Sequence, residues 1–130
     1  MRFIPTRVHG VLDYLVGILL IAAPWLLGFA DNTAQTYVPV ALGIMALVYS
    51  LCTNYELGAY KGISMKTHLT LDFLSGAFLA ASPWLFNFDD RVYMPHLILG
   101  IFEMGAALMT HLNPGPADNR LTGHHRQHAH

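Results

Sequence analysis

The sequence contains two copies of one pattern, and this duplication constrains the fold more than any other feature. In each copy a histidine precedes an aspartate by four residues, and a glycine, a Pro-Trp-Leu run and a phenylalanine follow in step. The matched residues are His9, Asp13, Gly17, Pro24, Trp25 and Phe29 in the first copy and His68, Asp72, Gly76, Pro83, Trp84 and Phe88 in the second. Repeat units share one structure and stack on each other. We therefore expect two equivalent halves packed together.

The chain is more apolar than a soluble domain. Of its 130 residues, 54% are hydrophobic and 12% are charged, whereas soluble domains carry roughly 25% charged residues. Four stretches nearly free of charge approach the ~20 residues that a membrane-spanning helix needs. They cover residues 14–30, 37–55, 73–88 and 94–110. The sequence therefore predicts an all-α, four-transmembrane-helix bundle built from two tandem two-helix repeats.

The duplication also predicts the boundaries of the domain. Repeat one covers about 7–55 and repeat two about 66–112, so that a four-helix transmembrane domain extends over 1–112. Because each repeat contains two spans, both copies have the same topology, and we expect a pseudo-twofold axis along the membrane normal. Residues 113–130 are polar and hold four of the eight histidines. We predict a disordered, His-rich cytoplasmic tail there.

The basic residues predict the orientation of this multi-pass protein. Six of the seven Lys and Arg residues lie before the first span, between the second and third, or after the fourth, and Arg91 lies in an outer turn. Cytoplasmic segments carry the excess of Lys and Arg. Both termini are therefore expected in the cytoplasm. The net charge of -1 gives no reason to expect a nucleic-acid partner.

Ionisable residues inside the apolar spans are the candidates for function. His9 with Asp13, and His68 with Asp72, each share one helical face and can form a local pair. If both faces point to the axis, the four side chains converge near the cytoplasmic side. Glu103, which an alanine matches in the first copy, adds a carboxylate nearer the midplane. Such residues face the bundle interior and invite a functional hypothesis.

Several roles are open to these residues. The preferred interpretation is a structural polar clasp that holds the two repeats together, and it requires no cofactor. A second is a site for a divalent metal, because mixed imidazole and carboxylate ligands suit Zn, Mn or Fe. A third is haem b between two histidines drawn from His9, His68 and His111. A fourth is proton or ion conduction by an oligomer that uses the three carboxylates.

Motifs of hydrolytic or nucleophilic catalysis are missing from the sequence. We find no Ser/His/Asp arrangement, Gly-rich phosphate loop or zincin motif. The single Cys52 excludes an internal disulfide. His96, alone near the outer end of the fourth span, is expected to be an interfacial residue. We therefore expect a protein that is not an enzyme.

A Ser-Pro-Trp tripeptide at residues 82–84, late in an apolar span and repeated as Ala-Pro-Trp at 23–25, resembles the SPW-repeat family of small bacterial integral membrane proteins. The resemblance covers residues 7–112. It implies two repeats of two helices each in a bacterial inner membrane, and it implies no active site. In this family Pro-Trp looks like a bend plus an interfacial anchor. That role is expected for Pro24, Trp25, Pro83 and Trp84.

The short loops leave little room for soluble machinery, so most of the recognisable surface faces lipid or other helices. We therefore expect an accessory or assembly subunit of a larger membrane complex, or a homo-oligomer. Its partners would be the lipid bilayer and other membrane-protein subunits or further copies of the chain.

Overall fold

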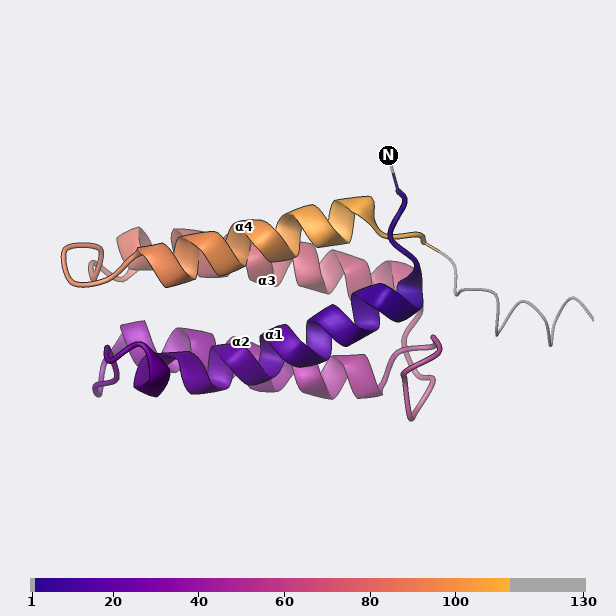
Figure 1. Cartoon of the computed structure of the whole chain (residues 1–130), viewed down its shortest axis with the longest axis horizontal. Helices are drawn as coiled ribbons and strands as arrows, with labels where there is room; N and C mark the ends of the chain where they lie inside the picture. The colour runs from indigo at the N-terminus through magenta and orange to yellow at the C-terminus, as the bar shows by residue number, and fades with distance from the viewer. Residues whose placement is uncertain (1, 113–130) are drawn as a thin grey trace, which may run out of the picture.

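The computed structural model describes residues 2–112, and these form four helices in chain order (Figure 1). Their bounds are α1 Thr6–Leu26, α2 Ala34–Leu51, α3 Met65–Leu85 and α4 Met94–Met109. The expected all-α class is confirmed. Both α1 and α2 are long and apolar enough to cross a membrane, and α4 is a shorter apolar helix. The predicted tail at 113–130 lies outside the described residues.

The helices form two hairpins that correspond to the two sequence repeats. α1 packs along α2, and α3 packs along α4, whereas contacts between the hairpins are fewer and run mainly from α2 to α3 (Figure 1). The start of α1, the connector between α2 and α3, and the end of α4 lie together at one end of the bundle (Figure 1). That end holds the candidate site.

Glycines permit the close approach of the two helices within each hairpin. A Cβ atom added at Gly43 would lie 2.6 Å from the carbonyl oxygen of Gly17, and one added at Gly100 would lie 2.5 Å from that of Gly76. Backbone atoms cannot move aside as a flexible side chain can. Small residues at helix interfaces are the usual means of close packing in membranes, and here both repeats use the same pair.

The Pro-Trp runs lie where α1 and α3 end. Each helix continues for two residues beyond its proline. In the first copy the N–H of Phe29 donates to the carbonyl of Pro24 at 2.8 Å, and Gly28 adopts a left-handed conformation with φ 76°. The second copy makes the same bond, with Asn87 at φ 57° in place of the glycine. This is a Schellman helix stop, for which glycine and then asparagine are best suited.

His96, expected to be an interfacial residue, is buried inside the bundle at the end opposite the candidate site. Its ring is buried and packs against those of Phe29 and Phe88, with centroids 5.2 and 4.9 Å apart. Its Nε2 lies 2.9 Å from the carbonyl oxygen of Gln35. The two helix stops turn their phenylalanines inward, and the imidazole fills the space between them.

The glycine contacts predict a difference between two substitutions on one helix. In Gly100→Ala the new methyl group meets backbone and should destabilise the fold by about 1–3 kcal/mol, as overpacking does. Gly105→Ala is the matched control, because a Cβ at Gly105 meets nothing within 4 Å. Reversible unfolding in mixed micelles gives the free energy of unfolding of each variant. Equal stability of the two variants would show that the glycine contact does not limit the packing.

Candidate functional site

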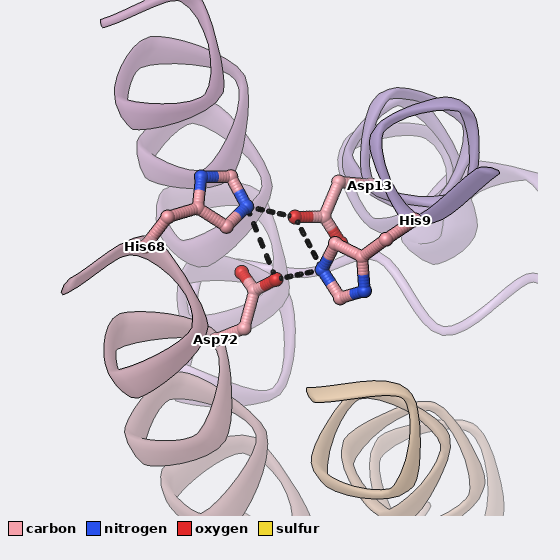
Figure 2. A group of neighbouring side chains, drawn as sticks. All are labelled: His9, Asp13, His68 and Asp72. Atoms are coloured by element: carbon pink, nitrogen blue, oxygen red, sulfur yellow. Dashed lines mark hydrogen bonds and ion pairs between the residues drawn. The ribbon is translucent and has the colours of Figure 1, made fainter. Parts of the chain in front are cut away.

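Four of the residues singled out by the sequence meet at one point between the hairpins (Figure 2). His9 and Asp13 extend from α1, and His68 and Asp72 extend from α3. All four side chains are buried, and one nitrogen or oxygen of each lies within 4.8 Å of those of the others. We call these four side chains the His–Asp ring, because the contacts drawn in Figure 2 close into a ring.

The shortest contacts of the ring join the two repeats. His9 Nε2 lies 2.5 Å from Asp72 Oδ2, and His68 Nε2 lies 2.5 Å from Asp13 Oδ2. The expected pairs within one helix are longer, at 3.2 Å in α1 and 3.3 Å in α3. Nε2 is at the tip of the imidazole, which extends away from its own helix. Each histidine therefore meets the aspartate of the facing helix more closely than its own.

Two threonines contact the other nitrogen of each ring. His9 Nδ1 lies 2.7 Å from Thr110 Oγ1, and His68 Nδ1 lies 2.7 Å from Thr53 Oγ1. Each threonine hydroxyl also donates to the backbone carbonyl four residues earlier. A hydroxyl has one proton to donate. Since that proton is already used, Nδ1–H must be the donor in both contacts.

This assignment determines the proton content of the ring. A neutral imidazole protonated at Nδ1 presents a lone pair at Nε2, and an ionised carboxylate has only acceptors. A contact of 2.5 Å between them therefore needs a proton on one of the two atoms. Two such contacts hold two protons, so each His–Asp pair is electrically neutral overall. Neutrality avoids the high cost of an uncompensated buried charge.

The two halves of the site differ at Tyr49 and Glu103. The Tyr49 hydroxyl donates to Asp72 Oδ1, whereas Ala106 occupies the matching position in the second repeat. Glu103 is 6% exposed and lies beside Gly76 on the facing helix. It does not belong to the cluster of four. The structure therefore brings four of the five predicted residues together and places the fifth nearby.

The structure does not bring the three candidate haem ligands together. His9 and His68 are both buried in the ring, and all four of their ring nitrogens have partners. His111 is exposed beyond the end of α4, where its backbone N–H donates to the carbonyl of Ile4.

The connector between α2 and α3, residues 52–64, packs over the ring. The fully buried Tyr55 has its ring centroid 5.6 Å from that of His68. Burial raises the pKa of the Tyr55 hydroxyl, which therefore stays neutral. The Thr6 hydroxyl donates to the Glu56 carboxylate at 2.7 Å, and the Tyr14 hydroxyl donates to the connector backbone at 2.8 Å. These bonds fasten the connector to α1.

Thr53 and Thr110 are site residues that the sequence reasoning missed. Short parallel bridges join Thr53 to Ile63 and Thr110 to Ile4, so the same backbone pairing positions both hydroxyls. A signal for them was present, because the interval from Thr53 to Thr110 equals that from Gly43 to Gly100. A threonine that occurs at the same position of both repeats indicates the same structural role in both halves. Tyr49 has no such signal.

The residues predicted to be anchors lie at the opposite ends of α1 and α3 from the ring. Trp25 and Trp84 are 64% and 49% exposed, whereas Pro24 and Pro83 are buried. The exposed indoles are suitably placed for an interfacial role, which stays a prediction.

Removing one threonine hydroxyl should destabilise the protein. Thr53→Val leaves the Nδ1–H of His68 buried without an acceptor, at a cost of about 1–3 kcal/mol. Thr70→Val is the matched control, because its hydroxyl makes the same bond to a carbonyl four residues earlier but is exposed on α3. Reversible unfolding in mixed micelles gives the loss of unfolding free energy in each variant. Equal losses of stability in the two variants would mean that the contact between Thr53 and His68 contributes nothing beyond the hydrogen bond from the threonine hydroxyl to its helix carbonyl.

The family comparison agrees with the architecture. The SPW repeat domain model matches residues 7–110, a range that includes all but the first residue of the two hairpins and the complete His–Asp ring. No curated protein matches the chain, and no solved structure does. Because the matched range covers most of the sequence, the chain belongs to the SPW repeat domain family.

Proposed function

We propose that the chain is a non-enzymatic integral membrane protein with four spans, which acts as an accessory or assembly subunit of a larger membrane complex or as a homo-oligomer. The observation that carries this proposal is the division between a closed polar interior and an apolar exterior. The His–Asp ring satisfies its own hydrogen bonds inside the bundle. Large apolar side chains are exposed on every helix, among them Leu15, Ile18, Ile44, Val48, Leu74, Phe78, Ile98 and Ile101.

The composition of α3 supports four spans rather than two. α3 and α1 both have 21 residues, but only α1 of these two is apolar enough to count as a span by composition. Three polar residues of α3 are buried inside the bundle, namely His68, Asp72 and Ser82. They lower the mean hydropathy of α3 without being presented to lipid. Its outward surface is therefore more suited to a bilayer than its composition indicates.

Charge and symmetry support the proposed placement in a bacterial inner membrane. The ring end of the bundle carries Arg2, Arg7, Lys61 and Lys66, and the opposite end carries Arg91. The excess of basic residues favours a cytoplasmic ring end and cytoplasmic termini. The matched glycine, threonine and histidine contacts of the two hairpins are those expected about a pseudo-twofold axis along the membrane normal.

Within this function the His–Asp ring acts as a polar clasp that holds the two hairpins together. Lipid tails are as apolar as leucine, so helices in a membrane are held by close packing and by hydrogen bonds between them. The ring supplies such bonds where the two hairpins meet. The connections outside the helices are short, and the described ones cover residues 27–33, 52–64 and 86–93. The surface available to partners is therefore mainly that of the apolar helix faces.

The proposed orientation predicts which engineered cysteines can be labelled from outside. In a Cys52→Ser background, Asn32→Cys lies in the exposed outer loop and Ala59→Cys lies in the exposed part of the connector. A membrane-impermeant maleimide should label position 32 in intact bacterial cells and position 59 only after lysis. Labelling of position 59 in intact cells would contradict the orientation, and labelling of neither after lysis would invalidate the assay.

The accessory role predicts a mass above that of one chain. Extraction from the native membrane in mild detergent should yield a particle heavier than the 14.4 kDa chain with its micelle, as measured by native mass spectrometry. The chain expressed alone is the control, since a homo-oligomer keeps its mass there and a subunit of a mixed complex does not. A monomer from both sources would contradict the proposal.

A further inference from the structure

We propose that the His–Asp ring is a binding site for one divalent transition-metal ion of the Zn²⁺ type, coordinated by His9, Asp13, His68 and Asp72. The ion would join α1 to α3 and so join the two repeats. This inference concerns the ring alone and does not depend on the accessory role.

Both histidines contact the same oxygen of each aspartate. Asp72 Oδ2 lies 2.5 Å from His9 Nε2 and 3.3 Å from His68 Nε2. Asp13 Oδ2 lies 2.5 Å from His68 Nε2 and 3.2 Å from His9 Nε2. Two nitrogens and two oxygens therefore alternate around one point (Figure 2).

A tetrahedral metal site can be formed from these atoms by small movements of the side chains. Zinc binds imidazole nitrogen and carboxylate oxygen at ~2.0–2.2 Å, and a tetrahedron with such bonds has edges of roughly 3.3–3.5 Å. Two of the four nitrogen–oxygen distances, 3.2 and 3.3 Å, already approach this length. The two contacts of 2.5 Å would each lengthen by about 0.8 Å. Binding of the ion therefore requires a rotation of the side chains by that amount.

The surrounding hydrogen bonds orient the ligands as metal sites do. A metal-binding histidine almost always donates its other ring N–H to a neighbouring oxygen, which fixes the tautomer and the orientation of the ring. Thr110 and Thr53 play this part here, and both leave the Nε2 lone pair directed into the ring. The Tyr49 hydroxyl occupies Asp72 Oδ1 and leaves Oδ2 to the ion. Both histidines and one of the two aspartates are therefore oriented by a further hydrogen bond.

Charge balance favours a divalent ion over other occupants. Two neutral imidazoles and two carboxylates carry a charge of -2, which one divalent ion cancels. The ion would replace the two protons that the hydrogen bonds of the ring require, and both protons would leave to solvent. The buried ring therefore stays neutral with either occupant. Mixed imidazole and carboxylate ligands suit Zn²⁺ and its first-row neighbours rather than Mg²⁺ or Ca²⁺.

The test uses the full-length chain purified in detergent without chelating columns. Four histidines near the C-terminus would take up metal on their own, so His124, His125, His128 and His130 are replaced by alanine throughout. This protein is incubated with Co²⁺ or Zn²⁺, desalted and subjected to elemental analysis. We expect one ion per chain, and for Co²⁺ we expect the intense visible absorption that distinguishes tetrahedral from octahedral coordination.

Two variants in the same background locate the ion. Asp13→Asn together with Asp72→Asn removes both anionic ligands at nearly constant volume and should abolish the bound metal and the cobalt absorption. His111→Gln is the matched control, because this exposed histidine lies near the same end of the bundle but outside the ring. It should keep one ion per chain. Helical circular dichroism and gel filtration establish that each variant is folded.

A third measurement keeps the test decisive if the double variant does not fold. An ion bound only by the folded state raises the unfolding temperature in proportion to the logarithm of its concentration. Zn²⁺ should therefore raise the unfolding temperature of the protein in which the ring is intact, and Mg²⁺ at the same concentration should not. Loss of the shift in His68→Gln assigns it to the ring. Retention of less than about a tenth of an ion per chain, or an octahedral cobalt spectrum, would overturn the proposal.

Discussion

The crosswise contacts of the His–Asp ring are the interaction on which the relation between the two hairpins depends. Inside each hairpin, glycine lets two helices pack backbone against backbone, and that contact needs nothing from the other half. Packing between the hairpins is sparser, and there the ring supplies two contacts of 2.5 Å. Interhelical hydrogen bonds in membranes contribute about 0.6–2 kcal/mol each. Their directionality also determines which faces of α1 and α3 meet.

The ring in turn depends on structure at the helix ends. Thr53 and Thr110 can accept from the histidines because their own protons go to helix carbonyls. Short bridges to Ile63 and Ile4 keep these threonines in position. Backbone pairing outside the helices can therefore influence the orientation of an imidazole. This chain of contacts runs from backbone pairing through hydroxyl to ring nitrogen, and it occurs once in each half.

The duplicated spacing made much of the fold predictable. Residues four apart share a helical face, so the two His and Asp pairs could be placed on one side of their helices before any contact was known. The proline and tryptophan runs indicated where α1 and α3 end. Thr53, Thr110 and Tyr49 were not predicted as site residues, and the burial of His96 was not predicted either. Tyr49 corresponds to an alanine in the other repeat, and His96 packs against two phenylalanines that turn inward from separate helix stops.

The sequence alone determined the helical class, the repeated pattern of the two hairpins and the four residues of the His–Asp ring. The periodicity of a helix specifies the direction in which each side chain extends from the helix axis. The repeat gives the same pattern a second time, in the other hairpin. The tertiary structure alone decided that each histidine meets the aspartate of the other repeat most closely, and that Glu103 and His111 stay outside the ring. Distances between helices depend on how the helices rotate and cross as they pack. Spacing within one helix cannot encode those quantities, so the four donors converge on one point only in the folded bundle.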